Sequence, residues 1–248
     1  MRNFKCGVVS VSFRQHSPRE IIQAASNAGL DCIEWGSDVH APCNNADAIS
    51  EIVALQKEFG ISCSSYGTYF YLGRDDVAEL HDYAAAAKRL GTDILRLWCG
   101  TKGSAEYSED EKQEFFDLCK RAAQIAQEEN VRLCMECHAH SYTDEPDAAL
   151  ELMHYVNSPH FLMYWQANQN ESLEYNLGYA KLIAPYTVNL HVFNMTGTVN
   201  SPLAEAKDTW RQYIDIFGGD RALLLEFMPD NKIESLEAEA KALIDIAS

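Results

Sequence analysis

The feature that most constrains the fold is a regular alternation of short apolar runs with amphipathic helical segments. The apolar runs, which are rich in β-branched and aromatic residues, predict strands at residues 5–11, 30–36, 61–67, 94–99, 131–138, 161–166, 186–193 and 222–227. Helical segments follow them at residues 18–28, 47–59, 75–90, 109–130, 146–156, 172–184, 202–217 and 233–246. A capping box, Ser17-Pro18-Arg19-Glu20, opens the first helix, and Gly29, Gly60 and Gly91 follow the first three.

Eight strand–helix units in 248 residues predict an α/β fold, a single-domain (β/α)8 TIM barrel. The competing architecture is a doubly wound open sheet, which usually has fewer units. Its dinucleotide-binding form also carries G-x-G-x-x-G after the first strand, and this chain does not. Because no Pro/Gly/Ser-rich segment interrupts the pattern, we expect one domain over residues 1–248.

Charge and composition restrict the partners. A formal net charge of -17 disfavours nucleic acid and anionic membranes, both of which attract clustered Lys and Arg. No apolar run reaches the roughly 18 residues of a membrane span, and the first residues lack the pattern of a secretory signal. We therefore expect a cytoplasmic protein with a small-molecule partner, no nucleic acid and no membrane, and we leave open whether it forms a homo-oligomer.

The eight cysteines are predicted to be buried thiols, because they are scattered among apolar runs and no export signal is evident. Cys134 and Cys137 form a C-x-x-C pattern within a predicted strand. Positions three apart on a strand point to opposite faces, so these two sulfurs are not expected to share a disulfide or a metal ion.

Polar side chains close four of the predicted strands at the end where barrel enzymes place their catalytic groups. They are Glu136 with His138 two residues further on, Gln166, His191 and Glu226. Two carboxylates, an imidazole and an amide oxygen form an oxygen/nitrogen ligand set with open positions. This set predicts a divalent metal ion (Mn, Co, Mg, Fe or Zn). The ligand types suit Mn, Co, Mg or Fe better than they suit a structural zinc. A metal-free hydrogen-bonded site is the alternative. His138 is expected either to donate a hydrogen bond to a substrate oxygen or to orient Glu136.

Further candidates for contact with a substrate lie near the strand ends or in the loops. Glu34 and Arg96 are either substrate ligands or a mutual salt bridge. Trp98 shares a face with Arg96 and suits a wall that stacks on a sugar, whereas Trp165 is the weaker candidate for such a wall. His40, in the loop at residues 37–42, is positioned to cover the site.

These residues resemble the xylose isomerase-like TIM barrel superfamily, in particular its sugar isomerase/epimerase branch, and the resemblance covers essentially the whole chain. It rests on Gly29-Leu30-Asp31-x-Ile33-Glu34, Glu136-x-His138, His191 and Glu226. The resemblance implies that Glu136 and Glu226 are both metal ligands and the acid/base pair. The chain departs from the branch at Gln166, where Asp is usual, and it lacks the branch's His at position 169 and its Arg after His191.

The leading hypothesis is a metal-dependent sugar isomerase or epimerase, which abstracts a proton next to the carbonyl of a small carbohydrate. An unphosphorylated sugar is favoured, because the loops after the seventh and eighth strands offer few groups for phosphate. One alternative is a dehydratase, that is, a lyase, of a cyclic polyol or keto acid. The other is a sugar-binding barrel whose catalysis is weakened by Gln166. A nuclease is disfavoured by the acidic charge.

Overall fold

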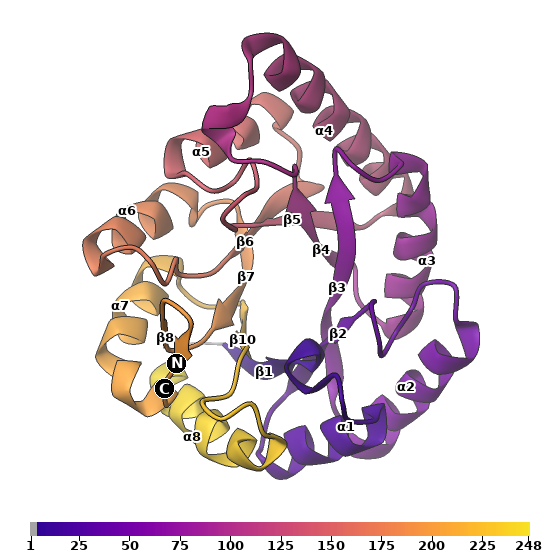
Figure 1. Ribbon diagram of the computed structural model, residues 1–248. Coiled ribbons are helices and arrows are strands. Elements are labelled where there is room, and N and C mark those ends of the chain that lie inside the picture. Colours follow the sequence, from indigo (N-terminus) through magenta and orange to yellow (C-terminus); the bar gives the residue numbers. More distant parts are fainter. Residues whose placement is uncertain (1–3) are drawn as a thin grey trace.

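The structure is a computed structural model that describes residues 4–248, and its described strands close into a parallel barrel (Figure 1). The barrel strands are β1 (Lys5–Val9), β2 (Cys32–Gly36), β3 (Ser62–Leu72), β4 (Ile94–Cys99), β5 (Arg132–Glu136), β6 (Phe161–Trp165), β7 (Thr187–Val192) and β10 (Ala222–Leu225). Each strand pairs with its neighbours in chain order, and β1 closes the ring by pairing with both β2 and β10. The predicted TIM barrel is confirmed.

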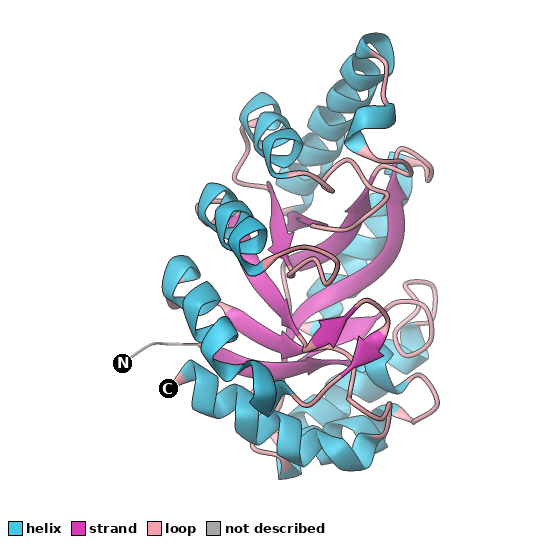
Figure 2. Ribbon diagram, turned by 60° about the vertical axis from the view of Figure 1, so that its left-hand side comes forward, coloured by secondary structure: helices cyan, strands magenta, loops and turns pink. Residues whose placement is uncertain are grey.

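Helices form an outer ring around the strands (Figures 1 and 2). They are α1 (Pro18–Asn27), α2 (Ala46–Phe59), α3 (Leu80–Leu90), α4 (Glu109–Glu129), α5 (Pro146–Val156), α6 (Leu173–Ile183), α7 (Lys207–Phe217) and α8 (Leu236–Ala247). Short 3-10 turns lie at Ser10–Phe13, Val77–Glu79, Ser104–Glu106, Leu203–Ala206 and Ile233–Ser235. α8 packs beside α1 and so completes the ring. Within residues 4–248, no helix combines the length and apolarity needed to cross a membrane.

Local sequence signals fix the helix ends. The capping box at α1 is present, with the Ser17 side chain accepting from the Glu20 N–H and the Glu20 carboxylate accepting from the Ser17 N–H. Ser108 caps α4 in the same way. Gly60 and Gly91 adopt the left-handed conformation that ends α2 and α3, as predicted.

The core has two layers, which follow the alternation of side chains along each strand. The larger layer lies between the strands and the helices and includes Trp35, Trp165 and Trp210. The smaller layer fills the inside of the barrel and includes Cys134, Tyr164 and Leu224. Cys137 belongs to the outer layer, so the two sulfurs of the C-x-x-C lie on opposite sides of the barrel wall, and all eight cysteines are free.

Several strand boundaries differ from the predicted ones. β1 ends at Val9, because the chain turns into a 3-10 helix at Ser10. β5 ends at Glu136, which leaves His138 in the following loop. β3 extends to Leu72, and after an irregularity its last residues pair again with Trp98 and Cys99 of β4. A two-stranded hairpin, β8 (Met195–Thr196) with β9 (Val199–Asn200), was not predicted.

Candidate metal centre and active site

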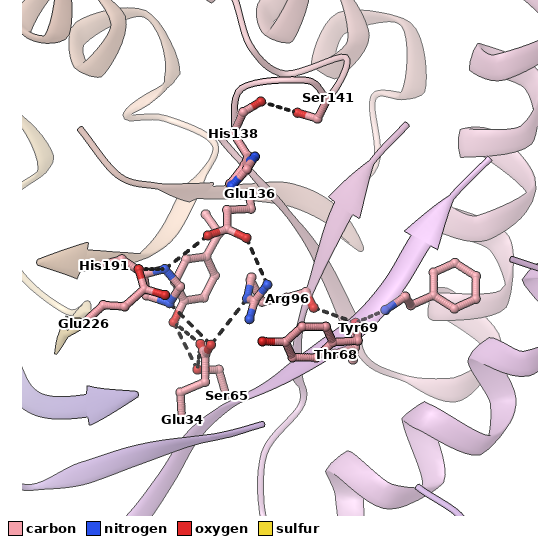
Figure 3. Close-up of polar contacts among 12 residues, drawn as sticks. Glu34, Ser65, Thr68, Tyr69, Arg96, Glu136, His138, Ser141, His191 and Glu226 are labelled. Atoms are coloured by element: carbon pink, nitrogen blue, oxygen red, sulfur yellow. Dashed lines mark hydrogen bonds and ion pairs between the residues drawn. The ribbon is translucent and has the colours of Figure 1, made fainter. Parts of the chain in front are cut away.

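Three of the predicted strand-end residues converge at the mouth of the barrel. Glu136 ends β5, His191 lies near the end of β7, and Glu226 directly follows β10. One ligand atom from each lies within 4.8 Å of those of the other two. The Nδ1 atom of His191 is 3.3 Å from Glu136 Oε1 and 3.3 Å from Glu226 Oε2 (Figure 3).

The geometry of this cluster fits a divalent cation. His191 is fully buried, and its Nδ1 atom has no hydrogen-bond partner in the described part of the chain, although two carboxylate oxygens are near. A buried nitrogen without a partner costs about 1–3 kcal/mol, which coordination would offset. Ligands at neighbouring corners of an octahedral site with bonds of about 2.1 Å are about 3.0 Å apart, close to the observed separations.

Gln166, the fourth predicted ligand, directly follows β6, and its half-buried side chain lines the same cavity as Glu136 and Glu226. Its amide oxygen is a suitable ligand for a hard cation but carries no charge. Gln166 therefore lies at the edge of the three-residue cluster as a candidate fourth ligand.

Arg96 connects two carboxylates beneath the cavity. Its Nη1 atom donates to Glu136 Oε2 at 2.9 Å, and its Nε atom donates to Glu34 Oε1 at 3.3 Å. Arg96 is only 2% exposed, yet it lines the cavity. Because Arg96 occupies one oxygen of Glu136, the other oxygen is left facing His191.

Glu34 was predicted either to contact substrate or to form a salt bridge with Arg96, and the structure places it below the cavity in that salt bridge. It is completely buried and does not line the cavity. Its Oε2 atom accepts from the Tyr164 hydroxyl at 2.6 Å and from Ser65 Oγ at 2.8 Å, and Oε1 lies 3.3 Å from His191 Nε2. Sequence reasoning missed Tyr164 and Ser65, although strand alternation places Tyr164 on the same face as Gln166.

Opposing charges shift the pKa values of this buried network. Burial raises the pKa of Glu136, but Arg96 and His191 outweigh it and bring the pKa to about 2. Burial likewise raises the pKa of Glu34, yet His191 and Arg96 hold it well below its usual range. Burial raises the pKa of Glu226. Burial alone would lower the pKa of His191, but Glu226 and Glu34 raise it to about 10.

A cavity of about 250 Å³ opens above the cluster. Trp98 lines it as predicted from the sequence, and its ring centroid lies 5.1 Å from that of Tyr69 and 5.9 Å from that of His138. These rings form an aromatic wall. Tyr69 was not foreseen, because it lies on the unexpected extension of β3. Trp165, in contrast, packs against Trp210 and Phe217 in the helix layer.

His138 is exposed and lines the cavity. Its Nδ1 atom lies 2.6 Å from the carbonyl oxygen of Ala139. A carbonyl oxygen only accepts, so Nδ1 carries a proton and Nε2 of the neutral ring is an acceptor. The sequence suggested either a donor to substrate oxygen or a residue that orients Glu136, whereas this geometry makes neutral His138 a candidate proton acceptor.

His40, the predicted cover of the site, is buried in the loop after β2 and is not among the described residues that line the cavity. Its ring nitrogens lie 3.1 Å from Ser10 Oγ and 3.1 Å from the carbonyl oxygen of His16. Both nitrogens are thus engaged with the 3-10 turn that follows β1 and with the segment after that turn. His40 ties these loops together from outside the cavity.

A closed parallel barrel with carboxylates and an imidazole gathered at its mouth defines a TIM barrel with a polar site at the carboxyl ends of its strands. The family model described as xylose isomerase-like TIM barrel matches residues 22–192, more than half of the chain. The chain belongs to this family.

Individual relatives are distant in sequence but match over nearly the full length. A 3-dehydroshikimate dehydratase of Bacillus anthracis is 23% identical over 273 residues, covering 96% of this chain and 96% of that protein. The crystal structure of the probable 3-DHS dehydratase AsbF of Bacillus anthracis superposes with a TM-score of 0.83 at 20% identity, covering 97% of this chain and 99% of the other. D-psicose 3-epimerase from Clostridium cellulolyticum H10, solved with D-tagatose, gives a TM-score of 0.71 at 13% identity, covering 98% of both chains.

Proposed function

We propose that this protein is a divalent-metal-dependent enzyme that removes a proton from the carbon next to a carbonyl of a small polyhydroxylated molecule. The observation that carries the proposal is the convergence of Glu136, His191 and Glu226 on the floor of a cavity of about 250 Å³. These three residues would hold the ion, with Gln166 as a fourth ligand. The bound ion would polarise the carbonyl and so acidify the neighbouring C–H. Two solved structures with a similar fold, one with magnesium and one with zinc, support a metal ion in this barrel.

The chain's own groups then have distinct tasks. Arg96 fixes Glu136 through Oε2 and presents a positive charge to the cavity. Trp98 and Tyr69 offer flat apolar surface to one face of a ring. Glu136, Glu226 and the Nε2 atom of His138 line the cavity and are able to take a proton from the substrate.

The first candidate reaction is dehydration. The C–H proton passes to His138 Nε2, its electron pair forms a carbon–carbon double bond, and the hydroxyl on the next carbon leaves as water when His138 gives that proton to it. Two relatives named as dehydratases cover nearly all of this chain and favour this reaction. Arg14 at the cavity rim suits an acidic substrate such as a keto acid, although Asp38 lies 2.6 Å from its Nε atom.

The second candidate is isomerisation or epimerisation of a sugar, the hypothesis that the sequence favoured. Here the proton is returned to a neighbouring carbon or to the opposite face, which requires two carriers. Glu136 and Glu226 both reach the cavity and supply such a pair. Structural neighbours named as epimerases, including an L-ribulose 3-epimerase with a TM-score of 0.72, favour this reaction.

One experiment separates the candidates. Protein loaded with Mn²⁺ is incubated in heavy water with 3-dehydroshikimate and with a panel of free ketoses. Dehydration appears as ultraviolet absorbance of the conjugated product, and isomerisation or epimerisation appears as deuterium on the carbon next to the carbonyl. Chelator-treated protein is the control. Tight binding without exchange or dehydration would instead support the sugar-binding barrel and contradict the enzyme proposal.

Two variants, His138→Gln and Glu226→Gln, identify the group that takes the proton in the same experiment. If dehydration depends on His138, then His138→Gln removes it while leaving metal binding in place. If the carboxylate pair carries the reaction, His138→Gln retains deuterium exchange and Glu226→Gln loses it. Full activity of both variants would contradict both assignments.

A further inference from the structure

Glu34 is the carboxylate of the barrel interior that the proposed reaction does not use. Its side chain is fully buried, whereas Glu136 and Glu226 reach the cavity. A buried carboxylate is costly unless donors receive it. Three of the four groups that face this one are Arg96 Nε, His191 Nε2 and Ser65 Oγ (Figure 3). The fourth is the Tyr164 hydroxyl.

The contact between Glu34 and His191 determines which ring nitrogen of His191 carries a proton. Glu34 Oε1 lies 3.3 Å from His191 Nε2, and an ionised carboxylate only accepts hydrogen bonds. Nε2 must therefore carry the proton. In a neutral ring the lone pair is then on Nδ1, the atom that faces Glu136 Oε1 and Glu226 Oε2.

Hydrogen bonds to both carboxylate oxygens fix the position of Glu34. Tyr164 and Ser65 hold Oε2, which leaves Oε1 for His191 and Arg96. The absence of a side chain at position 67 makes room for this arrangement. A Cβ atom added to Gly67 would lie 2.6 Å from Glu34 Oε1 and 3.0 Å from Arg96 Nη2.

We propose that Glu34 is a positioning residue of the metal centre, which fixes the Nε2–H tautomer and the orientation of His191 so that Nδ1 is presented to the ion. The inference rests on the proposed metal site. A partner of this kind behind a histidine ligand orients the ring and raises its basicity, and its loss typically lowers metal affinity 10–100-fold.

The test combines zinc affinity with the histidine tautomer. Zn²⁺ is diamagnetic, so protein labelled with ¹⁵N-histidine can be studied by long-range proton–nitrogen NMR with His191→Gln used for assignment. In the wild type we expect Nδ1 to bind zinc and Nε2 to be protonated. Glu34→Ala removes the acceptor and should lower zinc affinity 10–100-fold with loss of the single tautomer.

Glu34→Gln retains an acceptor oxygen, while the Tyr164 and Ser65 hydroxyls can turn to accept from its NH2 group. We expect this variant to keep the Nε2–H tautomer, to shift the Nε2 proton resonance upfield and to lose less affinity than Glu34→Ala. Glu239→Gln is the matched control, because Glu239 is a buried carboxylate of α8 that accepts from the Leu203 N–H at 2.9 Å. It should leave zinc binding unchanged.

Two failures can be told apart. Wild-type protein that binds no zinc through these residues would contradict the proposed metal site. Wild-type protein that binds zinc, with Glu34→Ala affinity within about twofold and the same tautomer, would overturn only the role of Glu34. If Glu34→Ala does not fold, an unchanged Nε2 proton resonance and affinity in Glu34→Gln overturn that role.

Discussion

At the scale of single residues, Glu136 and Glu226 share the cavity floor but differ in what holds them. Arg96 donates to Glu136 at 2.9 Å, whereas the described residues place no arginine or lysine within ion-pair distance of Glu226. Glu226 is also the more exposed of the two, at 8% against 4%. Glu226 is therefore the freer of the two carboxylates to exchange a proton with a bound molecule.

If the carboxylate pair carries isomerisation or epimerisation, replacing Glu226 by Gln should slow proton transfer without unfolding the barrel. The amide has the same shape but cannot take up a proton, and loss of a general base costs typically 10²–10⁴-fold in rate. Deuterium exchange on a ketose gives the rate, and circular dichroism melting gives the fold. An active Glu226→Gln protein would remove Glu226 from the reaction.

The charge on His191 predicts how metal binding depends on pH. Because neighbouring carboxylates raise the pKa of His191 to about 10, the metal-free ring is protonated at neutral pH, and an ion must displace that proton. Apparent affinity should therefore rise with pH, by up to about tenfold per unit, and level off near pH 10. Calorimetry in buffers of different ionisation enthalpy measures the released proton; no proton release at pH 7 would contradict the prediction.

The strand-end residues could be predicted because a polar side chain after an apolar run is conspicuous. Glu136, His191 and Glu226 were found in this way, and the structure brings them together. The partners of Glu34 could not be found so easily. Tyr164 and Ser65 are ordinary strand residues by type, and only the closure of the barrel shows that they meet a carboxylate more than thirty positions away in the chain.

At the scale of elements, β3 departs most from expectation. The sequence predicted a strand over residues 61–67, but the strand runs from Ser62 to Leu72 and carries Tyr69 to the cavity. Gly67 was taken as the end of the strand. It lies instead in the interior of β3, where its lack of a side chain accommodates Glu34 and Arg96.

Gly67→Ala should destabilise the protein by about 1–3 kcal/mol, because the new methyl group would overlap Glu34 Oε1. Gly178→Ala is the control. Gly178 lies inside α6, and beyond its chain neighbours and its own helix backbone no atom lies within 4 Å of an added Cβ. Ala there should therefore be neutral or stabilising by up to about 1 kcal/mol. Urea denaturation measures both, and equal stability of the two variants would show that β3 yields to the added group.

At the scale of the whole molecule, the carboxyl ends of the strands bring distant segments to one site, and an ion there would link β5, β7 and the residue after β10. The barrel itself was predicted because eight strand–helix units leave few other folds. The hairpin β8–β9, the loop position of His138 and the place of His40 outside the cavity were not, because loops are set by packing against the finished barrel and not by periodicity.

Metal removal should lower the melting temperature. A ligand present at 100 times its dissociation constant stabilises the folded state by about 2.7 kcal/mol, which corresponds to about 5–10 °C for a chain of this size. Differential scanning fluorimetry with Mn²⁺ or with a chelator measures the shift. The triple replacement of Glu136, His191 and Glu226 by Gln should abolish the shift, and a shift that survives it would place the ion elsewhere.

The most direct test of the metal centre is anomalous scattering from a crystal grown with Mn²⁺. We expect a manganese peak within about 2.0–2.3 Å of one carboxylate oxygen of Glu136, of His191 Nδ1 and of one carboxylate oxygen of Glu226. An empty cluster in a crystal whose protein is active, or a peak that His191 does not ligate through Nδ1, would contradict it.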